Sequence, residues 1–183
     1  MRVEFLGTGT STGVPMIGCR CDVCRSKDSR DRRLRSSVCL TVDDKNILID
    51  CGPDFRQQML RSGIDHIDAV LLTHEHYDHT SGLDELRNFS RNNPIPIYAE
   101  PNVLDIIHQR LFYCFSEQPN PGVAHLELKA IENLSPFTLF GIDIEPVRVW
   151  HYRLPIIGYR IGRFAYITDM LTIPDGECAK LPV

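Results

Sequence analysis

The chain has 183 residues, of which 43% are hydrophobic and 24% are charged, so it is neither disordered nor fibrous in composition, and its length favours one domain. The formal net charge of -4 provides no overall attraction for nucleic acid, so we do not expect a nucleic-acid partner. A Gly- and Thr-rich stretch begins at Gly7, before any apolar run reaches signal-peptide length, and no run of about 18 apolar residues follows, so we expect a cytoplasmic chain without a membrane partner.

Short β-prone runs and loops alternate along the first 50 residues. We expect a strand over residues 3–6, a Gly- and Thr-rich loop over 7–13 and an exposed, arginine-rich connector over 25–35. Residues 38–42 and 47–49 flank a turn-rich tetrad and therefore predict a β-hairpin.

Strands and helices then continue to alternate. Pro53 suits the first turn of a helix that would end at Gly63 and bury one face, made by Phe55, Met59 and Leu60. The further elements expected in this half are a strand over 67–72, a short helix with Leu83, Leu86 and Phe89, a strand over 96–99 and a helix with Val103, Leu104, Ile107 and Leu111. From residue 126 onward the pattern is mostly β, with strands expected at 126–130, 137–139, 142–144, 158–161 and 164–167.

Three histidines and one aspartate lie within six residues directly after the apolar run 67–72: His74, His76, Asp78 and His79. In extended backbone, residues i and i+2 point the same way, so His74 and His76 can reach one metal ion. Asp78 and His79 follow where the chain turns toward the next helix and can face a second ion. Imidazole and carboxylate together suit Zn²⁺, Mn²⁺ or Fe²⁺. The alternative is a solvent-exposed loop that contains histidines by chance.

This His-x-His-x-Asp-His motif after a strand resembles the signature of the metallo-β-lactamase superfamily. The resemblance implies an α/β (α+β) fold, an αββα sandwich in which loops at one edge of two facing sheets hold one or two metals. It also implies two ligands downstream at strand ends, which we assign to His151, after residues 147–150, and Asp169, after residues 165–168. Taken alone, His151 fits a metal ligand and a packed polar residue equally well, whereas an aspartate in the position of Asp169 is more often a turn residue.

The resemblance further implies how the ligands are shared: His74, His76 and His151 would hold one metal, Asp78 and His79 the other, and Asp169 would bridge the two. Among these, we expect Asp78, His76 and His79 to act in catalysis. Asp50 matches the family's aspartate before a glycine at a strand end, and we interpret it as the residue that orients a ligand histidine by accepting its second N–H. The alternative for Asp50 is an ordinary aspartate that terminates a strand.

A cysteine loop provides a second candidate site. Cys19, Cys21 and Cys24 place three thiolates within six residues, a spacing that can wrap one tetrahedral, structural zinc. The alternatives are a reduced surface cluster or a redox pair of Cys21 and Cys24. The remaining cysteines are expected to be buried apolar residues: Cys39, Cys51, Cys114 and Cys178.

The opening Gly7-Thr8-Gly9-Thr10, the cysteine loop and the histidine motif together resemble the PhnP-like branch of this superfamily. That branch implies hydrolysis of phosphodiesters, particularly small cyclic phosphates, by water activated by two divalent metals (Zn or Mn), with a structural zinc apart from them. Members continue past the last ligand with one more catalytic histidine and a histidine that completes the Cys₃ zinc. Only fourteen residues follow Asp169 and none is histidine, so we expect residues 1–183 to be one incomplete domain without its C-terminal α/β segment.

The leading hypothesis from the sequence is therefore a metal-dependent phosphodiesterase that acts on a small phosphodiester substrate. A homodimer is compatible with this hypothesis. One rival is an endonuclease of the transfer-RNA 3′-processing type, for which residues 25–35 would contact phosphate. Another rival is a non-catalytic metal-binding module.

Overall fold

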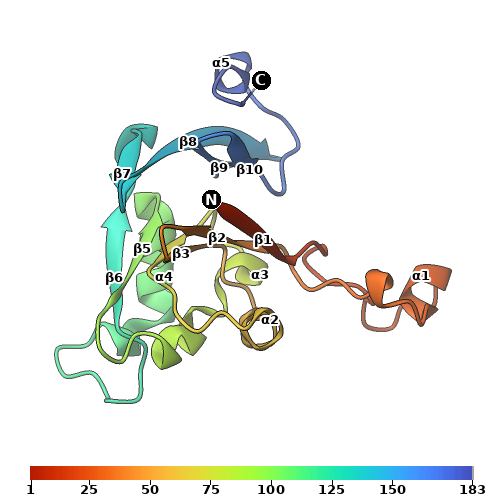
Figure 1. The fold of residues 1–183 in the computed structure, drawn as a ribbon, viewed down its shortest axis with the longest axis horizontal. Helices are drawn as coiled ribbons and strands as arrows, with labels where there is room; N and C mark the ends of the chain where they lie inside the picture. The colour runs from red at the N-terminus through yellow and green to blue at the C-terminus, as the bar shows by residue number, and fades with distance from the viewer. Residues whose placement is uncertain (183) are drawn as a thin grey trace.

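Two β-sheets face each other in the computed structural model, which describes residues 1–182 (Figure 1). The first sheet follows chain order across its six strands: β1 (Arg2–Gly7), β2 (Ser37–Val42), β3 (Lys45–Ile49), β4 (Ala69–Leu71), β5 (Ile95–Ala99) and β6 (Leu126–Ala130). Strands β1, β2 and β3 pair antiparallel, whereas β3, β4, β5 and β6 pair parallel.

The second sheet is antiparallel throughout and has the order β10-β9-β8-β7. Its strands are β7 (Phe137–Leu139), β8 (Ile142–His151), β9 (Leu154–Ile161) and β10 (Phe164–Tyr166). The strands predicted for this part of the chain are confirmed, but two of them are longer than expected: β8 continues from 142–144 to His151, and β9 begins at Leu154 instead of Gly158.

Helices lie on the outer faces of both sheets, except for a short one on an arm that projects from the body of the molecule (Figure 1). The α-helices are α1 (Asp22–Arg25), α2 (Phe55–Ser62), α3 (Tyr77–Thr80), α4 (Pro101–Arg110) and α5 (Asp175–Cys178). The short 3₁₀ segments are η1 (Ser29–Asp31), η2 (Leu83–Asn88), η3 (Phe112–Cys114) and η4 (Glu132–Leu134). Helices α2, α3 and α4 lie on the first sheet's outer side and α5 lies on the second sheet's outer side, so the predicted αββα order of layers is confirmed (Figure 1). Within residues 1–182, no helix is long and apolar enough to cross a membrane.

The hairpin of β2 and β3 turns more tightly than its sequence suggests. Lys45 and Asn46 already pair with Val42 and Thr41, so the turn consists of Asp43 and Asp44 alone. Both aspartates have positive φ angles, 46° and 63°, as a two-residue turn that matches the twist of its strands requires.

Helix α2 ends as predicted, because Gly63 adopts φ 71° and its N–H bonds back to the carbonyl of Met59. The prediction for its buried face was wrong at Leu60, whose side chain is 69% exposed. Gln58 is buried in its place, because its side-chain amide donates to the carbonyl of Arg35 at 3.0 Å.

The central strands of the first sheet are apolar on both faces because both faces are covered. In β3, for example, Ile47 and Ile49 pack in the cluster between the two sheets, with Ile144 and Tyr159. Leu48, which lies between them in sequence, packs in the other cluster, under the helices. The predicted runs of continuous apolar residues are explained by this double burial.

Hydrogen bonds join the two sheets just where β4 ends. The buried hydroxyl of Tyr159 donates to the carbonyl of Leu72 at 2.6 Å, and the amide of Ile157 donates to the carbonyl of Thr73 at 3.1 Å. Since His74 follows directly, these bonds fix the position of the histidine motif relative to the second sheet.

We expect Tyr159→Phe to lower the free energy of unfolding by about 1–3 kcal/mol, because the fully buried carbonyl of Leu72 would lose its donor. Urea denaturation monitored by fluorescence measures the change. The matched control is Tyr98→Phe, which removes a hydroxyl but keeps the ring stacked on Phe137. The centroids of these two rings are 5.2 Å apart. Equal losses in the two variants would contradict the role given to the Tyr159 hydroxyl.

Candidate metal centre

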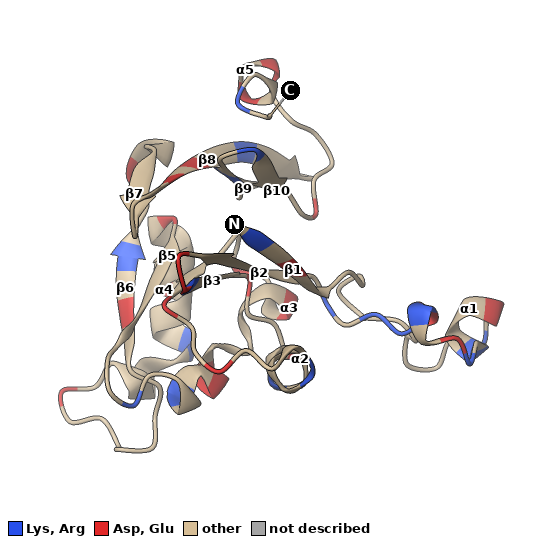
Figure 2. Ribbon diagram, viewed as in Figure 1, with Lys and Arg blue, Asp and Glu red and all other residues tan. Residues whose placement is uncertain are grey.

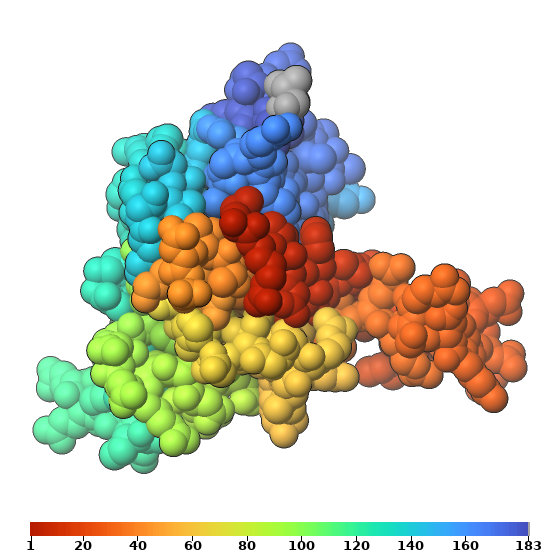
Figure 3. Space-filling view, viewed as in Figure 1, coloured from red at the N-terminus to blue at the C-terminus, as the bar shows by residue number. Residues whose placement is uncertain are grey.

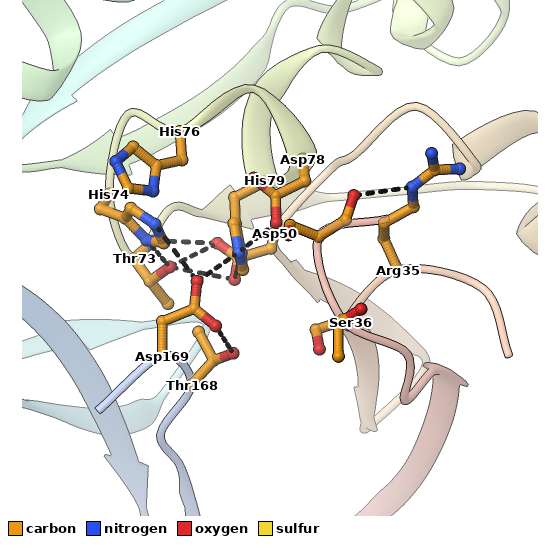
Figure 4. Close-up of polar contacts among 12 residues, drawn as sticks. Arg35, Ser36, Asp50, Thr73, His74, His76, Asp78, His79, Thr168 and Asp169 are labelled. Atoms are coloured by element: carbon orange, nitrogen blue, oxygen red, sulfur yellow. Dashed lines mark hydrogen bonds and ion pairs between the residues drawn. The ribbon is translucent and has the colours of Figure 1, made fainter. Parts of the chain in front are cut away.

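The ends of several strands meet at one edge of the two sheets and bring together the residues predicted as metal ligands (Figure 4). His74 and His76 follow β4, Asp78 and His79 lie in α3, His151 ends β8, and Asp169 follows β10. These residues are separated by up to 95 positions in sequence, so their convergence is a product of the fold.

The cluster consists of two groups that share one carboxylate. Ligand atoms of His74, His76 and Asp169 all lie within 4.8 Å of one another, and so do those of Asp78, His79 and Asp169. One oxygen of Asp169 is 3.0 Å from Nε2 of His79 and 3.6 Å from Nε2 of His74. Asp169 is thus the residue that the two groups share.

His151 stands slightly apart from these two groups. Its ring centroid is 5.3 Å from that of His76 and 6.1 Å from that of His74. It therefore lies on the side of the first group, beside the two histidines with which it was predicted to share a metal.

The donor set fits a divalent transition-metal ion. Nε2 of His74 is buried and has no hydrogen-bond partner among residues 1–182, while its Nδ1 lies 2.9 Å from the hydroxyl of Thr73. Burial, together with the charge of His79, lowers the pKa of His74 to about 4, so its ring is neutral at pH 7 and offers a lone pair. A buried nitrogen without a partner is costly, and a cation at this point would satisfy it.

Asp50 follows β3 and connects it, through one buried carboxylate, to Thr73 at the end of β4 and to His79 in α3. It accepts hydrogen bonds from the amide and the hydroxyl of Thr73 at 2.9 and 3.0 Å, and lies 2.7 Å from Nδ1 of His79. The sequence predicted a contact with a ligand histidine, and the structure places Asp50 in that position. Thr73 was not among the predicted residues, although a hydroxyl residue directly before the first histidine was a usable signal.

Close backbone packing holds Asp50 and α3 together. A Cβ atom on Gly52 would lie 2.0 Å from the carbonyl oxygen of Asp78, and the amide of Cys51 donates to the carbonyl of His79 at 2.8 Å. Asp50 itself adopts φ 61°, a left-handed conformation that aspartate tolerates better than most residues. Glycine is therefore required at position 52 by the contact with α3, the helix that carries two candidate ligands.

Three carboxylates surround His79 and decide its charge in the metal-free chain. Burial lowers the pKa of His79, but the charge of Asp50 and the hydrogen bonds with Asp169, Asp50 and Asp78 outweigh burial and raise it to about 12. The hydrogen bond from His79 in turn lowers the pKa of Asp169 to about 2. A protonated His79 thus balances negative charge that metal ions would otherwise balance, so metal uptake here is expected to release a proton.

The three cysteines of the loop lie together on an arm that projects from the body of the molecule (Figure 3). The sulfur atoms of Cys19, Cys21 and Cys24 lie within 4.8 Å of one another, as three ligands of one metal would. The amide of Cys24 donates to the sulfur of Cys21, and this bond lowers the pKa of the Cys21 thiol, which favours the thiolate.

The other cysteines follow the prediction with one exception. Cys39, Cys51 and Cys114 are buried, as expected. The prediction for Cys178 was wrong, since this residue lies exposed in the short helix α5, which buries none of its residues.

Comparison with known proteins gives a family match over residues 45–182, to the family described as the beta-lactamase superfamily domain. A Porphyromonas gingivalis protein named octanoyltransferase is 52% identical over 98% of this chain and 37% of its own length. A coenzyme PQQ synthesis protein B from Methylobacterium radiotolerans is 36% identical over 99% of this chain and 69% of its own length. The chain thus spans about one third of the first relative and about two thirds of the second.

Solved structures give the same picture. A diphosphatase from the PhnP family is 42% identical, with a TM-score of 0.89 over 97% of this chain and 68% of that one. Zn²⁺-bound PqqB from Methylobacterium extorquens is 26% identical, with a TM-score of 0.76 over 98% of this chain and 69% of that one. The short form of human tRNase Z is 22% identical with a TM-score of 0.70 over 98% of this chain and 73% of that one, a likeness of fold alone.

We expect the metal-free chain to be most stable near pH 6.5. The pKa of His74 is about 4 in the folded chain and 6.5 in the unfolded chain. Between pH 6.5 and 4 the unfolded chain therefore takes up a proton that the folded chain does not, and stability falls as the pH drops. The folded-state pKa of His79 is raised to about 12, so its contribution is complete below pH 6.5 and is lost as the pH rises toward 12. Urea denaturation in EDTA on both sides of pH 6.5 measures the two trends.

The acid side of this profile has its own control. His74→Phe removes the titrating group and should reduce the loss of stability between pH 6.5 and 4 by on the order of 3 kcal/mol. If the variant lost as much stability as the parent over this range, the profile would have another origin.

Proposed function

The chain belongs to the beta-lactamase superfamily, and from this premise we propose that it is a metal-dependent phosphodiesterase that hydrolyses small or cyclic phosphodiesters. The observation that carries the proposal is the pair of ligand groups that share Asp169, because two adjacent cations suit the attacking and leaving oxygens of phosphoryl transfer. The 42% identity to a PhnP-family diphosphatase, over 97% of the chain, supports phosphate chemistry in particular.

In this proposal the candidate ligands divide as the two groups suggest. His74, His76 and His151 would hold one divalent cation, Zn²⁺ or Mn²⁺, Asp78 and His79 would hold the other, and Asp169 would be a ligand of both. When bound, the two cations supply Lewis acidity, which lowers the pKa of water and neutralises charge on phosphoryl oxygens.

The residues around this centre have distinct tasks. The hydrogen bond with His79 lowers the pKa of Asp78, so this carboxylate is ionised at neutral pH and can accept a hydrogen bond from an attacking water. Asp50 holds the ring of His79 through Nδ1 and so directs its Nε2 toward Asp169. His76 is only partly buried, so it lies on the side that a substrate can approach.

The alternatives have weaker support. The arginine-rich segment at the base of the projecting arm would be the phosphate contact of a transfer-RNA endonuclease (Figure 2), but the chain as a whole is acidic. Octanoyl transfer is not proposed, because that name belongs to a protein most of whose length lies outside the match. A non-catalytic metal-binding module would differ in metal content, with zinc at the cysteine loop only.

We expect His76→Ala to lower the turnover of bis(p-nitrophenyl) phosphate by more than about a hundredfold, because one cation would lose a ligand. Elemental analysis of the same sample should show less catalytic metal. His108→Ala is the matched control, since His108 lies exposed on α4 and stacks on Phe115. Parental turnover in His76→Ala would refute the proposed site.

For the cysteine loop we propose a structural zinc, and Cys24→Ser should lower the zinc content by about one ion per chain while the metals at the histidine cluster remain. Inductively coupled plasma spectrometry measures the content. Cys178→Ser changes an exposed cysteine outside the loop and should leave the content unchanged. If Cys24→Ser and the parent had the same zinc content per chain, the proposal that the loop binds zinc would be wrong.

A further inference from the structure

We propose that Arg110, at the end of α4, is a positioning residue that holds the metal-ligand loop in place through its backbone. This inference rests on the proposed metal centre. Nη1 of Arg110 donates a hydrogen bond of 2.6 Å to the carbonyl of Glu75, the residue between the candidate ligands His74 and His76. Arg110 touches neither ligand side chain through this bond, so its effect would be on the path of the loop.

Thr80 extends this contact to the next peptide group. Nη1 of Arg110 also donates to Oγ1 of Thr80 at 3.2 Å, and the Thr80 hydroxyl donates to the carbonyl of His76 at 3.0 Å. Thr80 is buried, with 3% of its surface exposed. One guanidinium and one hydroxyl therefore hold two consecutive carbonyl groups of the loop.

These carbonyls need such partners because of where they lie. Residues 74–76 form neither helix nor strand, and the carbonyl of Glu75 takes its hydrogen bonds from side chains, whereas the carbonyl of His76 also accepts the amide of His79 at 3.1 Å. Each peptide group is planar, so holding the oxygen of Glu75 fixes the plane that leads into His76. The direction of the His76 side chain relative to His74 follows from that plane, and a charged donor holds it more firmly than a neutral one.

Arg110 is well placed to act as a fixed support. Val103, Leu104 and Ile107 bury α4 against the first sheet, so the helix is anchored by its apolar face. A cation in the last helical turn is also favourable beside the helix C-terminus. The guanidinium carbon lies 6.0 Å from the ring centroid of Tyr77, so Arg110 approaches the loop and the start of α3 together.

The test measures metal affinity directly. Co²⁺ titration of the metal-free protein gives d–d bands from both centres, whereas thiolate charge-transfer bands arise from the cysteine loop alone and allow the contribution of that loop to be subtracted. We expect Arg110→Met to weaken Co²⁺ binding at the histidine cluster about ten- to hundredfold, with the cysteine loop unchanged, and Arg110→Lys to restore part of the affinity. Arg87→Met is the matched control, because it removes an exposed arginine that pairs with Asp84 within η2.

Thr80 offers a second pair of variants if Arg110→Met fails to fold in EDTA. Thr80→Val should weaken Co²⁺ binding, and Thr80→Ser, which keeps the hydroxyl, should not. In the double variant Arg110→Lys/Thr80→Val the losses should not add, because both residues hold one loop. Parental affinity and parental d–d bands in folded Arg110→Met, or in Thr80→Val, would overturn the positioning role. If the parent itself bound no Co²⁺ at the histidine cluster, the proposed metal centre would fail instead.

Discussion

The buried carboxylate of Asp50 is the constraint on which the rest of the site depends. It follows β3, binds Thr73 at the end of β4 and contacts His79 in α3, so one charged group joins two parallel strands and the first helix beyond them. A fully buried carboxylate is tolerated only when hydrogen bonds and opposite charge surround it. The candidate ligands meet those requirements, which links the folding of this edge to its charge balance.

The second sheet contributes to the same centre in a different way. Its strands supply His151 and lead to Asp169, and the bonds from Tyr159 and Ile157 hold it to the end of β4. The distance between the two halves of the cluster is therefore set by neutral hydrogen bonds inside the core. Charged groups thus orient single side chains at the centre, whereas contacts in the core set the spacing between the two sheets.

Much of this arrangement was predictable because it is local in sequence. The histidine motif follows a short apolar run, and Gly63 marks the end of α2, as a reader of the sequence expects. The exposure of Leu60 was not predictable, since it depends on Gln58 reaching the carbonyl of Arg35, a contact between distant segments. The contact of Arg110 was missed for the same reason, because a backbone carbonyl as partner leaves no pattern in the sequence.

The strand order of the first sheet has a consequence for how the chain acquires its structure. Each of the five strands after β1 pairs with the strand before it in sequence, so we expect this sheet to assemble progressively during synthesis on the ribosome. The carboxylate that lies between the two ligand groups emerges much later, after β10. While the strands of the second sheet are still being translated, a nascent chain would thus have an incomplete set of metal ligands. Stable metal binding would therefore be among the last steps of its folding.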